Sequence, residues 1–309
     1  MSEVTLQDFA DSFGTTADDI PVECRELIGE SDFSYRILDG EERDNTLLEV
    51  LKRIKSDRQV IGAPERKNVW QDGWENNLRD FIASGYNLDT LIPRYVRKDQ
   101  PIRFNRRYVI PANPLFEWDF LRVLRVWIFI KYLKNCKSFY EFGCGTGHNL
   151  VELSRLYPDM KLYGFDFVPA ACKLVDTIGE VHGLKMIGRQ FDMTSPDNDI
   201  YFDANSAVFT FGAIEQLAGN FEPFLQFLLH RKPSLCINIE PTIELFDETN
   251  LVDYLAIEFQ RKRGYSEKYL PRLKELESQG KIEIVKVKRT FLGNLMMEGY
   301  SLMVWRPAG

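Results

Sequence analysis

Hydrophobic and polar positions follow two rhythms in the second half of the chain. From residue 138 onward, short apolar runs end near an acid or a glycine, and segments with apolar residues every three or four positions lie between them. Such alternation predicts parallel strands with helices packed on both faces of the sheet. The runs that predict strands are residues 138–142, 161–166, 207–212 and 234–239.

Helical spacing separates these runs and continues after them. Residues 221–230, 251–261 and 267–279 repeat apolar positions at the helical period. Two further strand-like runs, residues 281–289 and 299–305, lie near the end of the chain. Because the connection between these two runs is short, we expect the two strands to be antiparallel.

The first part of the chain lacks this alternation. Residues 46–54 place their aliphatic side chains on one face, which predicts a short amphipathic helix, and residues 69–78 lead into another helix. Residues 116–133 are typical of one long helix that enters the core. We therefore predict a mostly helical N-terminal subdomain over residues 1–115 and an α/β domain over residues 116–309.

The most specific pattern lies between the first predicted strand and the helix that follows it. Residues 138–150 read Ser-Phe-Tyr-Glu-Phe-Gly-Cys-Gly-Thr-Gly-His-Asn-Leu. Glycines there allow a positive φ and let the backbone approach a ligand closely. Their spacing differs from the G-x-G-x-x-G of dinucleotide-binding folds. Glu141, just before the loop, would repel a pyrophosphate and favour a cation.

This motif resembles the first motif of the class I S-adenosylmethionine-dependent methyltransferases, and three further markers follow in order. They are Asp166 at the end of the second strand, Asp192 near the end of the third, and the run of residues 207–212. The resemblance covers about residues 120–307. It implies a Rossmann-like, doubly wound, mostly parallel seven-stranded sheet with an antiparallel last strand. A doubly wound fold that uses the loop only as a turn is the alternative.

The resemblance also implies S-adenosyl-L-methionine as the cofactor and assigns residues to it. Asp166 would accept hydrogen bonds from both ribose hydroxyls, and Asp192 would contact the adenine amine while its apolar neighbour packs on the ring. The implied cofactor-binding residues are Glu141, Gly143, Gly145, Thr146, Gly147, Asp166, Phe167, Asp192, Met193 and Phe211.

Three residues are candidates for catalysis. Ligands of open parallel sheets bind beyond the carboxyl ends of the strands, and an alcohol acceptor also needs a base. Glu240 follows the fifth strand, Glu215 follows the fourth, and His148 lies in the glycine loop. Many relatives carry Glu-His after the fourth strand, where this chain has Gln216. Alternatively, Glu240 caps a turn, Glu215 contacts the cofactor or holds the loop, and His148 is a polar residue at a helix start.

Substrate contacts are expected from residues 67–116, which are rich in aromatic side chains and arginines. Arginine binds phosphate or carboxylate, and aromatic rings cover a sugar or a base. The predicted substrate-binding residues are Trp74, Arg106, Arg107 and Tyr108, with Glu244 and Tyr254 from the segment after the fifth strand. Trp70, Tyr95 and Arg103 belong to the same dense region. A packed helical subdomain with a solvated basic face is the alternative.

Composition limits the cellular compartments and the partners that we expect for this protein. The net charge of −7 argues against a dedicated nucleic-acid binder. Five cysteines without a C-x-x-C pair and three scattered histidines predict reduced thiols and no zinc cluster, and no metal site is predicted. The N-terminus lacks a secretory signal, and the longest apolar stretch, residues 123–130, is interrupted by charge. We therefore predict a cytoplasmic protein without a membrane span.

The sequence thus predicts a methyltransferase with a substrate-binding or lid subdomain over residues 1–115 and a cofactor-binding domain over residues 116–309. The expected acceptor is a hydroxyl or amine of a small anionic metabolite, such as a sugar or a nucleotide-linked sugar. Motifs after residue 238 loosely resemble methyltransferases found with surface-polysaccharide biosynthesis. The alternatives are a methyltransferase that acts on protein or nucleic acid, and a cofactor-binding scaffold without catalysis. The oligomeric state stays open.

Overall fold

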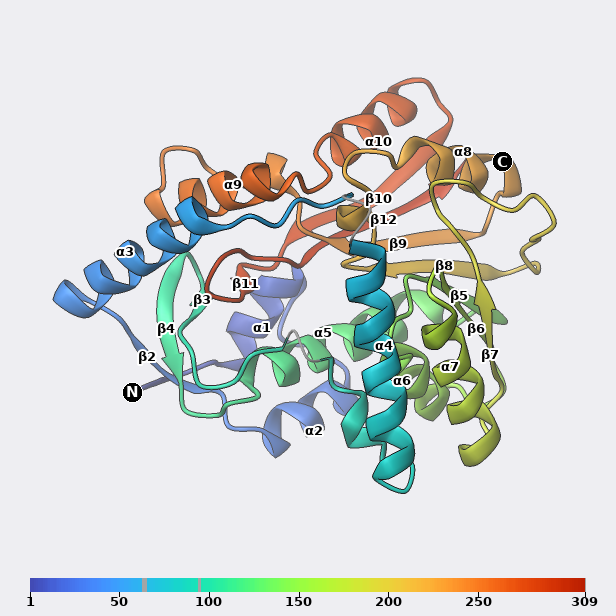
Figure 1. The fold of residues 1–309 in the computed structure, drawn as a ribbon, viewed down its shortest axis with the longest axis horizontal. Helices are drawn as coiled ribbons and strands as arrows, with labels where there is room; N and C mark the ends of the chain where they lie inside the picture. Colours follow the sequence, from blue (N-terminus) through green and yellow to red (C-terminus); the bar gives the residue numbers. More distant parts are fainter. Residues whose placement is uncertain (63–65, 94–95, 309) are drawn as a thin grey trace.

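A seven-stranded sheet forms the centre of the computed structural model, which describes residues 1–62, 66–93 and 96–308. The strand order is β10-β12-β9-β8-β5-β6-β7 (Figure 1). The strands are β5 (Ser138–Phe142), β6 (Lys161–Asp166), β7 (Met186–Gln190), β8 (Ser206–Phe211), β9 (Leu235–Glu240), β10 (Ile282–Arg289) and β12 (Ser301–Pro307).

Strand directions agree with the predicted fold class. β5 pairs in parallel with β6 and β8, β6 with β7, and β8 with β9. β12 is antiparallel to both β9 and β10. The mostly parallel, seven-stranded sheet with a reversed last strand is therefore confirmed, and β12 reverses because only a short connection separates it from β10.

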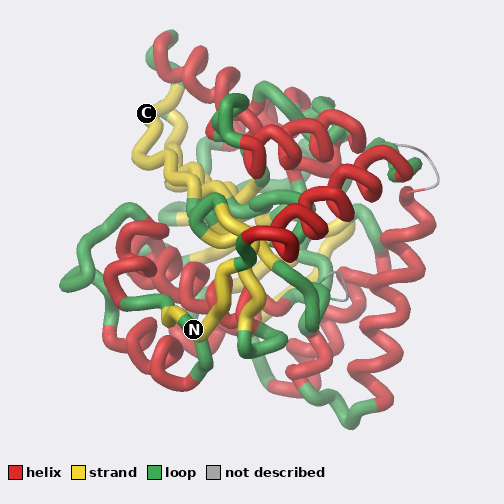
Figure 2. Tube along the Cα trace, turned by 90° about the vertical axis from the view of Figure 1, so that its left-hand side faces the viewer, coloured by secondary structure: helices red, strands yellow, loops and turns green. Residues whose placement is uncertain are grey.

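Helices cover both faces of this sheet, as the alternating pattern predicts (Figure 2). Successive residues of a strand point to opposite faces. Phe139 of β5 therefore packs in one apolar cluster with α5 (Phe116–Leu133), α6 (His148–Leu156) and α7 (Pro169–His182). Its neighbour Tyr140 packs in a second cluster with α8 (Glu222–Arg231) and α10 (Tyr269–Ser278).

The N-terminal part contains the two predicted helices, which are α3 and α4, together with further helices and a second sheet that the sequence did not predict. The helices are α1 (Leu6–Phe13), α2 (Val22–Glu30), α3 (Gly40–Ser56), α4 (Arg66–Ala83) and the short helix η1 (Leu88–Leu91). The sheet has the order β1-β2-β4-β3-β11. Its strands are β1 (Ser2–Glu3), β2 (Ser34–Ile37), β3 (Ile102–Phe104), β4 (Arg107–Pro111) and β11 (Leu292–Gly293).

This second sheet joins the two ends of the chain. β11 comes from the connection between β10 and β12, yet it pairs with β3. Phe9 and Phe13 share one apolar cluster with Phe129 and Phe139 of the α/β part. A boundary at residue 115 stays a prediction, because the main core extends across it. Among the described residues, no helix is long and apolar enough to cross a membrane.

A buried ion cluster fixes the start of α9 (Leu251–Arg263) against the end of β10. Arg289 donates hydrogen bonds of 2.7 and 2.6 Å to Asp253 and one of 2.7 Å to Glu298. The side chains of Asp253 and Glu298 are 0 % and 2 % exposed. Loss of one partner from such a cluster leaves a buried charge without compensation.

We expect Asp253→Ala to lower the free energy of unfolding by about 3–5 kcal/mol, because Arg289 then stays buried with half of its charge balance removed. Urea denaturation measures the loss. Glu283→Ala is the control: Glu283 lies on β10, the strand of Arg289, and pairs with Arg306 at the surface. That variant should lose less than about 1 kcal/mol. Equal losses in both variants would contradict a special role of the buried cluster.

Candidate functional site

The glycine loop between β5 and α6 is held by the end of β6. The backbone N–H groups of Gly143 and Cys144 both donate to the Phe165 carbonyl, at 2.7 and 3.0 Å. Gly143 and Gly145 have φ angles of +74° and +52°, a region that favours glycine. A Cβ at Gly143 would lie 2.5 Å from the Cβ of Ala213, so this loop also packs tightly on the loop after β8. The predicted strand, loop and helix are all confirmed.

Trp74 of α4 lies directly on this loop. A Cβ built at Gly145 would meet Cζ2 of Trp74 at 2.9 Å. Trp74 stacks on Trp70 with ring centroids 5.6 Å apart, and both rings pack against the apolar start of α7. α4 therefore covers the glycine loop (Figure 1). The sequence assigns Trp74 to the substrate, whereas the structure places it against the predicted cofactor loop.

Asp166, the predicted ribose ligand, is engaged by backbone in this conformation. Its side chain accepts hydrogen bonds from Gly145 N at 3.1 Å and Val168 N at 3.0 Å, and the residue is 4 % exposed. Burial raises the pKa of Asp166 to about 6. Each carboxylate oxygen can accept a second hydrogen bond, so a ribose contact stays a prediction.

Beneath the loop lies a buried group of hydrogen-bond acceptors. Asn149 donates from Nδ2 to Oε1 of Glu141 at 2.6 Å, and both residues are 1 % exposed. Oε2 of Glu141, Oδ1 of Asn149 and Nε2 of His148 are buried and have no hydrogen-bond partner among the described residues. Burial raises the pKa of Glu141 to about 8. Buried polar atoms without partners are rare in folded proteins, so these three atoms suggest a ligand.

The hydrogen bonds around His148 determine which ring nitrogen carries the proton. The Thr146 hydroxyl donates to the Leu91 carbonyl at 2.8 Å, and its oxygen lies 3.0 Å from Nδ1 of His148. Because that hydroxyl proton is already used, Nδ1 must be the donor, and Nε2 presents a lone pair. Burial and the charge of Arg125 lower the pKa of His148 well below its usual value, which keeps the ring neutral.

Two residues of α5 complete this buried group, and the sequence did not single them out. The guanidinium of Arg125 lies 4.6 Å from the ring centroid of Trp118 and 5.8 Å from that of Phe211. Trp118 in turn contacts His148, with ring centroids 4.9 Å apart. In the sequence, Arg125 appears only as a charge that interrupts the apolar run of residues 123–130. A charged residue on an otherwise apolar helix was the available signal.

Glu240 and Glu215 lie together beyond the carboxyl ends of β8 and β9. Glu240 is 2 % exposed, and its carboxylate accepts from Ala213 N at 3.1 Å and Glu215 N at 3.2 Å. Burial raises the pKa of Glu240 to about 7. Glu215 accepts from the Gln216 side chain at 2.8 Å, and burial raises its pKa to about 8, with the charge of Glu240 adding to the shift. Glu240 thus caps the loop after β8, and Glu215 is nearer the surface.

A cavity of about 540 Å³ opens between α4, the start of α7 and the end of β7. Two predicted cofactor residues, Phe167 and Asp192, line this cavity together with Phe191, which directly precedes Asp192 in the sequence. Asp192 accepts from the backbone and hydroxyl of Thr194 at 2.8 and 2.7 Å, while Met193 packs against the neighbouring apolar cluster. The lining is Asn68, Gln71, Phe167, Val168, Pro169, Gln190, Phe191, Asp192 and Asp197.

The remaining predicted substrate residues do not meet at the glycine loop. Arg106, Arg107 and Tyr108 line a separate pocket beside α3 and α9. Tyr254 is 44 % exposed on α9, and Glu244 accepts from Lys268 N at 2.6 Å at the surface. Tyr95 lies outside the described residues. Within the described ranges, no three His, Cys, Asp or Glu side chains form a cluster that could hold a metal ion.

Known structures share this fold, whereas no family model matches the sequence and no curated protein is similar to it. The cyclase SpnF superposes with a TM-score of 0.52 and 13% identity, covering 82% of this chain and 100% of SpnF. A structure of PigF with SAH gives 0.46 and 14%, covering 86% and 70%. An O-methyltransferase of Brevibacillus brevis in complex with S-adenosyl-L-homocysteine gives 0.42 and 13%, covering 60% and 72%. The likeness to SpnF, together with the strand order, confirms the predicted fold.

The contact between Gly145 and Trp74 can be measured by substitution. We expect Gly145→Ala to lower the free energy of unfolding by more than the roughly 1–2 kcal/mol of a left-handed alanine, because its Cβ also meets the indole. Gly183→Ala is the control: Gly183 has a φ of +65° and nothing within 4 Å of its Cβ position. In a Trp74→Ala background the cost of Gly145→Ala should fall to that of Gly183→Ala. An unchanged cost there would contradict the contact.

Proposed function

We propose that this chain transfers a methyl group from S-adenosyl-L-methionine to a hydroxyl or amine of a small anionic metabolite, such as a sugar or a nucleotide-linked sugar. One observation carries the proposal: three buried acceptor atoms, which have no partner among the described residues, lie beside a glycine loop of the matching sequence motif. The shared fold is consistent with it, although SpnF shows that this fold also serves a cyclase.

The buried acceptors fit the amino-acid tail of this cofactor. Glu141, Asn149 and His148 offer one free acceptor each, the number of N–H donors on an α-ammonium group. Burial alone favours the neutral form of Glu141, and a bound ammonium group restores the carboxylate, which then balances its charge. Arg125 is a nearby cation for the tail's carboxylate. A dinucleotide carries no ammonium group. These acceptors therefore favour S-adenosylmethionine over a ligand with a pyrophosphate.

The cavity that Phe167 and Asp192 line would hold the adenine end of the cofactor. A ring face and an acid there suit the adenine base and its amine. Trp74 covers Gly145 between this cavity and the buried acceptors, so its indole has to move before a ligand can contact both. When bound, the cofactor supplies the electrophilic methyl group.

Residues beside the loop after β8 would meet the acceptor. Nη2 of Arg66 donates to Oε1 of Gln216 at 3.1 Å, and its guanidinium lies 5.3 Å from the ring centroid of Trp70. An arginine next to an indole suits an anionic group attached to a sugar or a base. Glu215, beside Gln216, is the candidate base there. Glu240 instead holds the loop through backbone N–H groups.

A scaffold that lacks catalysis is the second candidate function. The observation in its favour is the closed loop: Trp74 rests on Gly145, while the Asp166 carboxylate accepts hydrogen bonds from the backbone N–H groups of Gly145 and Val168. Release of S-adenosylhomocysteine in the presence of anionic sugars and nucleotide-linked sugars would support the enzyme. Cofactor binding without turnover on any of them would support the scaffold.

The tail site is tested by comparing two ligands. Methylthioadenosine shares the adenosine and thioether of S-adenosylhomocysteine but lacks the amino-acid tail. We expect Glu141→Gln to weaken S-adenosylhomocysteine binding at least about tenfold, because a charge-assisted hydrogen bond is lost, and to leave methylthioadenosine binding unchanged. Calorimetric titration gives both dissociation constants.

Glu152→Gln is the matched control for that comparison. It makes the same chemical change on α6, where Glu152 pairs with Arg122 away from the buried acceptors. S-adenosylhomocysteine affinity should be that of the unmodified chain. An equal loss of both ligands in Glu141→Gln, or no loss of either, would reject the assignment of the tail to these acceptors.

The base is tested by a pH profile. A Glu215 carboxyl with a pKa of about 8 becomes an acceptor of protons only as the pH rises through that value, so kcat should rise across it. Glu215→Gln should lower kcat about 10²–10⁴-fold and remove this rise. Glu240→Gln should instead lower the melting temperature, because an amide then faces the N–H groups of Ala213 and Glu215. A normal rate and profile in Glu215→Gln would exclude Glu215 as the base.

A further inference from the structure

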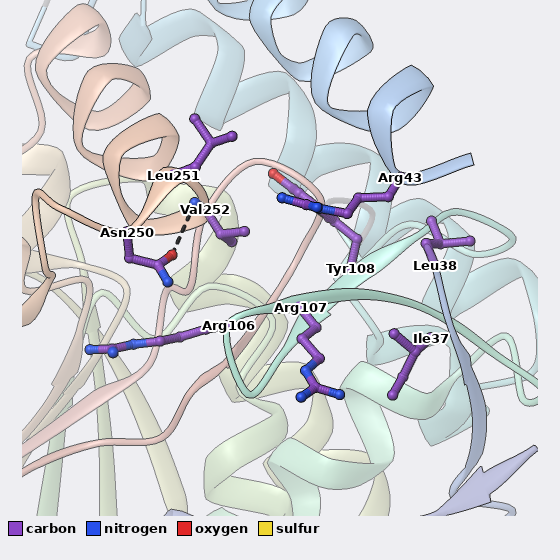
Figure 3. A pocket seen from close by; sticks show the side chains of 9 residues that line it. All are labelled: Ile37, Leu38, Arg43, Arg106, Arg107, Tyr108, Asn250, Leu251 and Val252. Atoms are coloured by element: carbon purple, nitrogen blue, oxygen red, sulfur yellow. Dashed lines mark hydrogen bonds between the residues drawn. The ribbon is translucent and has the colours of Figure 1, made fainter. Parts of the chain in front are cut away.

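A second pocket lies on the opposite side of α4 from β5 and β6 (Figure 1). It has a volume of about 300 Å³ and opens between α3, the β3–β4 turn and the start of α9 (Figure 3). Such a volume is at the lower end of small-molecule sites. The lining is Ile37, Leu38, Arg43, Arg106, Arg107, Tyr108, Asn250, Leu251 and Val252.

Three arginines surround this pocket although the chain as a whole is acidic. Arg106 is held near Asp247 at 3.8 Å and Asp253 at 3.4 Å. In the part of the chain that the structure describes, Arg43 and Arg107 form no ion pair. Both are exposed, and the charge of Arg43 is available to a ligand.

The turn that presents Arg106 and Arg107 has an unusual backbone. Asn105 and Arg106 link β3 to β4 with φ angles of +48° and +58°, the left-handed region that a side chain such as arginine seldom adopts. Glycine would take this conformation without strain. The turn directs Arg106 and Arg107 to different sides of β4 (Figure 3).

The remaining walls of the pocket indicate which other groups a ligand would carry. The start of α9 contributes Leu251 and Val252, at the positive end of a 13-residue helix. Ile37 and Leu38 supply an apolar wall on the opposite side. Tyr108 is fixed by a 2.9 Å hydrogen bond from Arg103, which is itself fully buried and donates to two backbone carbonyls. The pocket therefore combines a rigid apolar lining with a cationic rim.

This pocket is separate from the candidate methyl-transfer site. α9 is anchored to the end of β10, the outermost strand, whereas the glycine loop follows β5. Four inter-strand spacings, roughly 19 Å in all, lie between those two strand ends. Figure 1 shows α3, β4 and α9 on one side of α4, with β5 and β6 on the other. One small ligand cannot reach both.

We propose that this pocket is a second ligand site, which binds a small anion carrying a phosphate or carboxylate on an apolar body. Arg43, whose guanidinium lies beside Tyr108, binds the anionic group, and Val252 contacts the body, while Arg107 points to the other side of β4 (Figure 3). The proposal does not rest on the proposed methyl transfer, since it uses none of the residues at the glycine loop.

The test is a calorimetric titration of the full chain at low salt with phenyl phosphate, inorganic phosphate and benzoate. We expect saturable binding of one equivalent of phenyl phosphate, tighter than inorganic phosphate because the ring contacts the apolar walls. Benzoate distinguishes a carboxylate ligand from a phosphate ligand. Arg43→Gln should weaken binding about tenfold, the loss typical of a charge-assisted hydrogen bond, whereas Arg107→Gln, on the other side of β4, should leave it unchanged.

Two further variants separate the pocket from general charge. Arg53→Gln removes the same charge from the same helix outside the pocket, where Arg53 pairs with Glu49, and should leave binding unchanged. Leu251→Trp fills the pocket at a residue that is 48 % exposed, keeps every arginine, and should abolish binding. The proposal is overturned if neither phenyl phosphate nor benzoate saturates, or if Leu251→Trp binds normally. S-adenosylhomocysteine affinity should not change in any of these variants.

Discussion

The attachment of the glycine loop to the end of β6 is the constraint on which the candidate site depends. Phe165 accepts two backbone N–H groups of the loop, and Asp166 accepts a third from Gly145. Because β6 pairs in parallel with β5, this attachment fixes where α6 begins. The position of His148 and Asn149 beneath the loop follows from that start.

The loop also explains why so many polar atoms are buried at this one place. Glu141, Asp166 and His148 are each desolvated, and burial shifts the pKa of each toward its neutral form. Such desolvation is unfavourable for folding unless a partner compensates. Asp166 has its partners in the backbone, whereas Glu141 and His148 retain acceptor atoms without one. That difference marks the space beneath the loop as a place for a ligand rather than an ordinary part of the core.

The structure places arginines at two separate sites, which the sequence does not distinguish. Arg125 is buried beside the glycine loop and Arg66 lies at its edge, while Arg43, Arg106 and Arg107 surround a pocket at the far side of the fold. The second sheet causes this separation, because β11 pairs with β3 and holds the β3–β4 turn beyond β10. The same pairing buries Arg103, which serves as a structural support for Tyr108.

The sequence by itself determined the strand and helix order of the α/β part, the extent of α5, and the glycine loop with its positive φ angles, because local hydrophobic period and glycine spacing encode them. The family resemblance assigned Phe167 and Asp192 to one cofactor, and the structure places both at one cavity. Only the tertiary structure decided that Trp74 covers Gly145, that Arg125 and Trp118 reach His148, and that Arg106 and Arg107 lie away from the loop. Those contacts join residues far apart in the chain, and neither period nor spacing carries information about them. The two-stranded contact of β11 with β3 is too short to leave a pattern, yet it decides where the N-terminal arginines lie.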